Sequence, residues 1–117
     1  MKLIKIANSK NNEILGDKII YANTPYRRFI GLMGKKEINE GQGVFLTPCN
    51  SIHMMFMKFP IDIIFLDRKN KIIHITENIQ PWKISKIVFM AQSVLELPVG
   101  SVSKTDSKVG DKLTIEF

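Results

Sequence analysis

The sequence predicts a mainly β protein, a compact β-sandwich or small barrel of short strands with one short helix at about residues 25–33. Short apolar or alternating segments recur along the chain and are separated by turn residues, which is typical of strands. One of them, residues 61–66, is apolar on both faces, as expected for a strand packed between two layers. Only one segment carries both start and stop signals of a helix.

The expected strands follow from the spacing of apolar residues. Residues 3–7 alternate between two faces, and 13–22 forms a second strand beyond a cluster of turn residues, so the two pair as a hairpin. Residues 61–66 and 71–76 form another hairpin around a polar turn. The remaining strands are expected at 44–46, 51–57, 94–97 and 112–117.

The helix expected at about residues 25–33 has signals at both ends. The Thr24 hydroxyl can accept hydrogen bonds from the first amides, and Gly34 suits the left-handed residue that follows a helix. The apolar side chains between them recur at helical spacing and form one face. Arg27 and Arg28 lie off that face.

Composition and charge limit the classes of function. The chain has 117 residues, 44% of them hydrophobic and 24% charged, and we expect residues 1–117 to form a single domain. No apolar run could span a bilayer and the N-terminus lacks a signal-peptide core, so we expect a cytoplasmic protein with no membrane partner. The net charge of +6 comes mainly from scattered lysines, which argues against nucleic-acid binding. The sequence does not determine the oligomeric state.

The segment around His53 contains the sharpest local pattern. Cys49, His53 and Met57 are separated by three residues each, a spacing similar to that of copper ligands in some β-sandwich proteins. Such a site needs a second histidine, and in an extended strand His53 and Met57 would lie ~13 Å apart. We therefore expect no metal and no cofactor. The methionines in this segment indicate core packing or the wall of an adaptable apolar pocket.

Two carboxyl groups occur in apolar surroundings. Asp62 lies in the strand expected at 61–66, where a carboxylate is costly unless it is paired. It is either a structural pin that meets loop amides or Arg28, or one wall of a polar site with His53. Glu96 lies between two leucines, so it faces either solvent or the same site.

Several segments resemble a known family when they are taken together and in order. They are Arg28–Gly34, Cys49–His53, Ile61–Asp67, Val94–Gly100 and Gly110–Asp111. This set is similar to the uncharacterised prokaryotic family called domain of unknown function 192 (DUF192), and the resemblance extends from about Tyr21 to the end of the chain. It implies a compact β-rich sandwich with a short helix. It implies no activity, because none is established for the family.

We expect a domain that binds a small ligand in a cleft near His53. The arginines would hold an anionic group, while methionine and aromatic side chains would contact an apolar portion. The candidate ligand-binding residues are Arg27, Arg28, His53, Met57, Asp62 and Glu96. Two alternatives stay open: a hydrolase-type enzyme that uses His53 and Asp62 as an acid–base pair, and a protein-interaction or structural module. Because no complete catalytic motif is present, we assign no catalytic residue.

Overall fold

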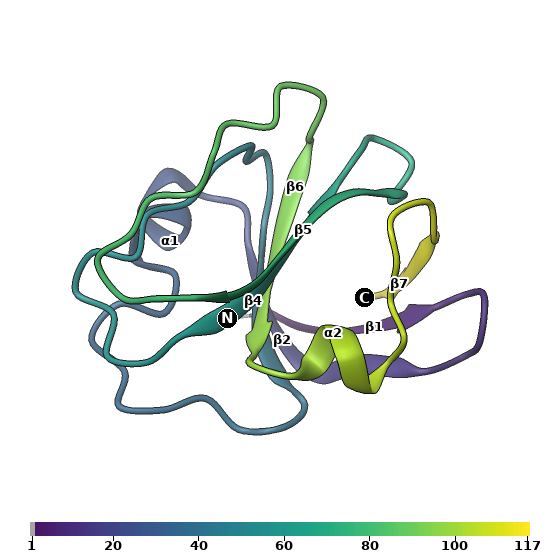
Figure 1. Ribbon diagram of the computed structural model, residues 1–117, viewed down its shortest axis with the longest axis horizontal. Helices are drawn as coiled ribbons and strands as arrows, with labels where there is room; N and C mark the ends of the chain where they lie inside the picture. Colours follow the sequence, from purple (N-terminus) through teal and green to yellow (C-terminus); the bar gives the residue numbers. More distant parts are fainter. Residues whose placement is uncertain (1) are drawn as a thin grey trace.

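The structure is a computed structural model that describes residues 2–117, and it contains seven strands and two short helices (Figure 1). In chain order the elements are β1 (Leu3–Asn8), β2 (Ile14–Ala22), α1 (Pro25–Ile30), β3 (Gln42–Leu46), β4 (Ile61–Leu66), β5 (Ile72–Ile79), β6 (Ser93–Pro98), α2 (Ser101–Lys104) and β7 (Leu113–Glu116). The prediction of a mainly β fold is confirmed. Within the described residues, no helix has the length and the apolar character needed to cross a membrane.

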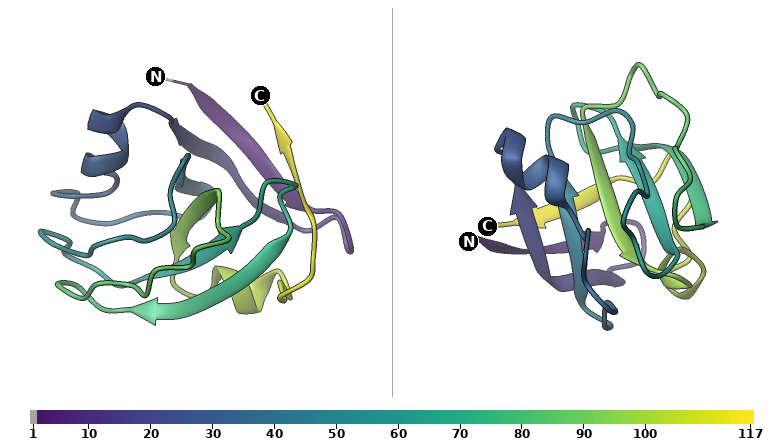
Figure 2. Two further views of the ribbon diagram at one scale, coloured as in Figure 1. Left: turned by 90° about the horizontal axis from the view of Figure 1, so that it is seen from above. Right: turned by 90° about the vertical axis from the view of Figure 1, so that its left-hand side faces the viewer.

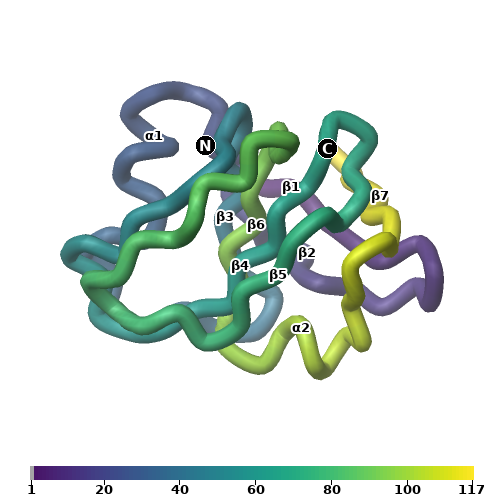
Figure 3. Tube along the Cα trace, turned by 45° about the horizontal axis from the view of Figure 1, so that its top comes forward, coloured from purple at the N-terminus to yellow at the C-terminus, as the bar shows by residue number. Residues whose placement is uncertain are grey.

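All seven strands belong to one sheet, in the order β5-β4-β6-β3-β2-β1-β7. Neighbouring strands are antiparallel except β2 and β3, which are parallel. The sheet curls into a half-barrel (Figures 2 and 3). Its edges meet at one end, where Ile72 N–H donates to Asp111 O at 2.8 Å and Leu113 N–H donates to Asn70 O at 2.9 Å.

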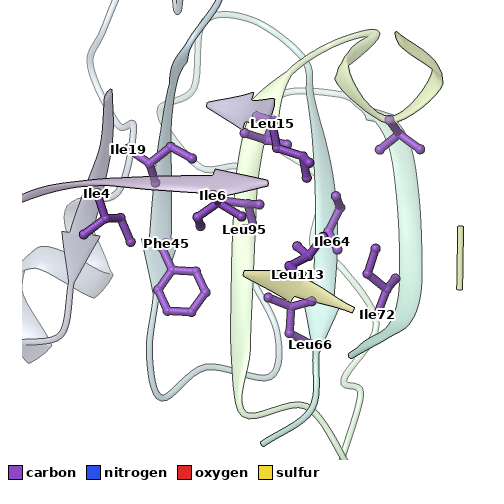
Figure 4. Close-up of a cluster of buried hydrophobic side chains, with 12 residues drawn as sticks. Ile4, Ile6, Leu15, Ile19, Phe45, Ile64, Leu66, Ile72, Leu95 and Leu113 are labelled. Carbon is purple, nitrogen blue, oxygen red and sulfur yellow. The ribbon is translucent and has the colours of Figure 1, made fainter. Parts of the chain in front are cut away.

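The inside of the curl holds the first hydrophobic core (Figure 4). Every strand contributes to it, from Ile72 on edge strand β5 to Leu113 on edge strand β7, and α2 adds Val102. Strands from opposite edges of a sheet can share one core only when the sheet curls around it. Removal of this apolar surface from water is the main force that favours the curl.

A second core covers the outer face of the central strands. It lies between β3, β4 and β6 on one side and the segments 31–38, 49–59 and 88–91 on the other. Strand β4 separates the two cores, and all six of its residues are buried. The expectation that residues 61–66 pack between two layers is thereby confirmed. Both faces of this strand are apolar because each face packs against one of the two cores.

Three local elements differ from the sequence-based expectation. The first helix ends at Ile30 because Gly31 has φ 47° and ψ −117°, a conformation that cannot continue a helix. Residues 51–57 form a loop rather than a strand, because their backbone bonds run irregularly to residues 83–85 and only His53 forms a bridge, with Ile84. Helix α2 is only four residues long, and its local pattern was too short to predict it.

Candidate functional site

A cavity of about 270 Å³ lies on the outer face of the sheet, between α1 and the loop that follows β3. Apolar side chains from both elements form most of its wall. The polar side chains that line it are Arg28, Cys49, Ser51, His53 and Glu96. Four of the six candidate residues therefore meet at one cavity: Arg28, His53, Met57 and Glu96.

Glu96 lies at the inner end of this cavity. It occupies the middle of β6, opposite Val44 of β3 and Ile63 of β4, which both belong to the second core. The residue is only 5% exposed, and its Oε1 has no hydrogen-bond partner within residues 2–117. Burial raises the pKa of Glu96 to about 8, so the carboxyl group is mainly protonated at neutral pH.

Two glycines allow the chain to pass close to Glu96. A Cβ atom on Gly31 would lie 3.4 Å from Glu96 Oε1, so the end of α1 is placed directly against the carboxyl group. A Cβ atom on Gly43 would lie 2.5 Å from the Glu96 backbone oxygen, a distance that any side chain would violate. The absence of a side chain at Gly43 is therefore required for β3 to pack this closely against β6, whereas the contact at Gly31 is an ordinary van der Waals one.

Arg28 projects from α1 toward the same cavity. Its Nη1 donates to Pro48 O at 3.0 Å and ties the helix to the segment that follows β3. Its Nε is buried and has no hydrogen-bond partner in the described part of the chain. Burial is the main cause that raises the pKa of Cys49; nearby Glu96 adds to this effect when it is ionised, and positively charged Arg28 opposes it.

The Cys49 thiol is an unreactive part of the wall. Its Sγ–H donates to Ser51 O at 3.0 Å, and burial raises the pKa of the thiol. A raised pKa keeps the sulfur protonated and therefore weakly nucleophilic at neutral pH. Sequence reasoning singled out Cys49 for its spacing from His53 but did not place it at the site.

His53 lies at the mouth of the cavity. Its ring is tilted against that of Phe29, with the centroids 5.4 Å apart, so α1 and the 51–57 loop touch there. Its Nδ1 accepts a hydrogen bond from Met55 N–H at 3.3 Å. Met57, from the same loop, is buried in the second core and lines the cavity wall.

Asp62 does not reach this cavity. It pairs in register with Leu97, whose side chain lies in the first core, so its carboxylate points to the inner face of the sheet. There it accepts backbone N–H groups from Asn78 at 2.9 Å and from Gly100 and Val102 at 3.1 Å each. This is the contact pattern of a structural pin, the first of the two alternatives given for Asp62, and it leaves Asp62 outside the cavity that His53 lines.

Arg27 is also separate from the cavity. It follows Tyr26 on the exposed side of α1, and it is absent from the cavity lining. The reason is helical geometry, because consecutive residues of a helix point about 100° apart and only one of two adjacent arginines can face the sheet. Among residues 2–117, no group of three or more His, Cys, Asp or Glu side chains is placed to hold a metal ion.

The fold and the site together define a small half-barrel domain with a buried carboxyl group at the inner end of an apolar cavity. The chain matches the family DUF192, "Uncharacterized ACR, COG1430", over residues 5–115, and it belongs to this family. The resemblance found in the sequence is thus confirmed. The family is one of unknown function, so membership assigns no ligand and no reaction.

Relatives and a solved structure agree with this assignment. The chain is 29% identical over 116 residues to a UPF0127 protein of Thermococcus sibiricus, which covers 95% of this chain and 74% of that protein. It is 31% identical over 113 residues to UPF0127 protein PH1112 of Pyrococcus horikoshii, covering 92% of this chain and 96% of that protein. A crystal structure of a protein of unknown function from Novosphingobium aromaticivorans has the same fold, with a TM-score of 0.81, 21% identity and coverage of 95% and 82%.

Proposed function

We propose that the protein binds a small carboxylate with an apolar body in the cavity between α1 and the 51–57 loop. The observation that carries this proposal is a pair of buried polar atoms, Arg28 Nε and Glu96 Oε1, that have no partner within residues 2–117. Both residues line the same cavity. Buried polar groups in native proteins are nearly always hydrogen-bonded, so an unpartnered pair at a cavity indicates a ligand that supplies the partners.

The chemistry of the two groups favours a carboxylate. Arg28 carries a positive charge and only donates hydrogen bonds. Since burial raises the pKa of Glu96 to about 8, its carboxyl group also has a proton to donate at neutral pH. A ligand that satisfies both groups must accept hydrogen bonds and benefit from a nearby positive charge, which a carboxylate does.

The apolar lining and the small volume of the cavity favour a ligand whose remaining part is small and apolar. Leu46, Ile52 and Met57 surround the polar groups, and a volume of about 270 Å³ is slightly below the range typical of drug-sized ligands. Methionine side chains adapt to different shapes at little cost. Phe29 and His53 would contact the outer part of the molecule at the mouth of the cavity.

The hydrolase alternative has no comparable support. It requires His53 and Asp62 within hydrogen-bond reach or joined through one water. Asp62 instead satisfies three backbone amides on the other face of the sheet. Binding without chemistry is therefore the function that this geometry supports best.

A thermal-shift screen tests the proposal with a panel of short aliphatic and aromatic monocarboxylates and their uncharged amides. A binder at a hundred times its Kd should stabilise the protein by about 2.7 kcal/mol, and its amide should stabilise the protein less. Arg28→Leu should abolish the shift, whereas Arg27→Leu, on the exposed neighbour, should leave it intact. The proposal fails if no acid stabilises the protein, or if both arginine variants respond alike.

Ionisation of Glu96 supplies a second test with the same binder. Two carboxylates in one apolar cavity repel each other, so affinity should fall as the pH rises through about 8. Glu96→Gln keeps an N–H donor but does not titrate, so its affinity should stay constant over that range. A wild-type affinity that rises with pH would contradict the assigned role of Glu96.

A further inference from the structure

Three turns in the outer loops have large apolar residues at their tips. In each turn the backbone N–H of the last residue donates to the backbone oxygen of the first residue. The turns are 54–57, 80–83 and 88–91. Their central residues are Met55-Phe56, Pro81-Trp82 and Phe89-Met90. Phe89 and Met90 are 84% and 78% exposed. Turn tips normally carry Gly, Asn, Asp, Pro or Ser, so three apolar tips need a reason.

Two of these tips also adopt an unfavourable backbone conformation. Phe56 has φ 62° and Trp82 has φ 69°, in the left-handed region that bulky residues rarely occupy. The other non-glycine residues at positive φ in the described chain are asparagine or aspartate: Asn12, Asn70, Asn78 and Asp106. Aromatic residues thus replace the residues that these turns would prefer. Strain of this kind is concentrated at functional positions.

Two of the apolar tips, at 54–57 and 80–83, lie at the end of the molecule that carries the cavity mouth. The Phe56 and Trp82 rings are 5.0 Å apart, and Ile84 bridges to His53, which itself touches Phe29. Figures 1 and 3 show α1 and the loops that carry these two turns toward one end, away from β7 and the β1–β2 turn, whereas the 88–91 turn lies nearer the β4–β5 turn. We name this surface the apolar rim and define it as Phe29, Phe56, Trp82 and Ile84, all of them exposed.

Positive charges predominate around the apolar rim, although exposed Glu37 and Glu77 directly adjoin the segments that form it. The segments 18–36, 41–61 and 78–95, which supply every residue of the rim, contain no aspartate or glutamate. They contain exposed cationic residues instead: Arg27, Lys35, Lys36, Lys58, Lys83 and Lys86. The ion pairs within residues 2–117 involve other lysines, those at 5, 10, 104 and 108. The cations near the rim are therefore available to an external partner.

We infer that the apolar rim docks on the surface of a bilayer that contains anionic lipids. Separate protruding apolar tips can enter the interfacial layer, where aromatic side chains are favoured, while the surrounding cations meet the headgroups. A second copy of the chain would bring like charges together, and an RNA or DNA backbone would leave the apolar tips unused. The inference goes beyond the proposed carboxylate binding and does not depend on it.

This mode of contact needs no membrane-spanning segment. The expectation of no membrane partner was based on the absence of an apolar run long enough to span a bilayer. Adsorption to a bilayer surface depends instead on exposed apolar area and charge, and both become visible only when the loops are folded side by side.

The protein carries its own probe for this test, because Trp82 is its single tryptophan and lies at one of the tips. We would titrate the protein with vesicles of phosphatidylcholine and with vesicles that also contain phosphatidylglycerol. The expected result is a blue shift of the Trp82 emission, with quenching by brominated acyl chains, for the anionic vesicles alone. Binding should weaken as the salt concentration rises. No shift with anionic vesicles at low salt would overturn the inference.

Matched variants distinguish binding through the apolar rim from nonspecific adsorption to vesicles. Phe56→Ser with Ile84→Ser should weaken binding to anionic vesicles at least about tenfold. Val109→Ser, at an exposed apolar position of the turn before β7, should leave it unchanged. Likewise, Lys83→Glu with Lys86→Glu should weaken binding, whereas Lys112→Glu, at an exposed position just before β7, should have a much smaller effect.

Two outcomes of the variant series would overturn the inference. One is an equal loss of vesicle binding in rim and control variants that circular dichroism shows to be folded. The other is a concentration-dependent dimer that disappears in the rim variants, since the occupant of the surface would then be a second copy of the chain. Sedimentation without vesicles distinguishes this case.

Discussion

Replacing Glu96 by glutamine should remove a large pH dependence from the free energy of unfolding. Burial raises the pKa of this carboxyl group from 4.5 to about 8 in the folded protein. Between these two values the folded state holds a proton that the unfolded state has released, so stability falls as the pH rises. Over this pH range the free energy of unfolding of the wild type should fall by on the order of 5 kcal/mol. The loss is complete above about pH 8.

Urea unfolding, followed by far-ultraviolet circular dichroism at several pH values from 4 to 9, measures this effect. Glu96→Gln cannot titrate, so the stability of the variant relative to wild type should rise by about 1.4 kcal/mol per pH unit inside the window. The other titrating groups are common to both proteins and cancel in the difference. Glu77→Gln, on an exposed residue, serves as the matched control.

A difference between wild type and Glu96→Gln that stays constant from pH 5 to 8 would refute the reasoning. It would mean that the folded protein does not hold Glu96 protonated, and that the carboxylate finds a partner or water inside the cavity. An ionised Glu96 could not donate a hydrogen bond to a carboxylate ligand, so this result would also contradict the proposed role of Glu96 in binding.

Three further predictions concern single positions. Asp62→Ala should cost about 3 kcal/mol in urea unfolding, because three backbone amides, one of them buried, lose their acceptor; an unchanged stability would exclude the structural pin. Gly31→Ala should lower the melting temperature, because φ 47° with ψ −117° is a conformation that alanine rarely adopts; an unchanged melting temperature would contradict this. Because burial raises the pKa of Cys49, its thiol should react slowly with a disulfide reagent at pH 7 and rapidly in urea; equal rates would contradict its burial.

Much of the fold follows from local patterns. The apolar residues on both faces of 61–66 predicted a strand between two layers, and β4 does separate the two cores. Thr24 predicted the helix start, and its side chain accepts a hydrogen bond from Arg27 N–H at 3.2 Å. These features were predictable because alternation and capping depend only on residues close together in sequence.

The loop at 51–57 and the short helix α2 were not predictable in this way. The apolar residues of 51–57 fit a strand as well as a covering loop, and the choice depends on irregular backbone bonds to 83–85. Helix α2 begins at Ser101, beside Val102, whose amide bonds to Asp62 forty residues earlier. Contacts between residues so far apart in sequence cannot be predicted from the local pattern.

By itself, the amino-acid sequence determined the mainly β class, the family, and the small set of ionisable residues that lie in apolar surroundings. Only the tertiary structure decided that Glu96 faces the cavity while Asp62 faces the first core. In a strand, successive side chains alternate between two faces, so the local pattern shows that a carboxyl group stands among apolar residues without showing which face it points to. The side depends on how β4 and β6 pair with each other and on which way the whole sheet curls, and these are properties of residues distant in sequence.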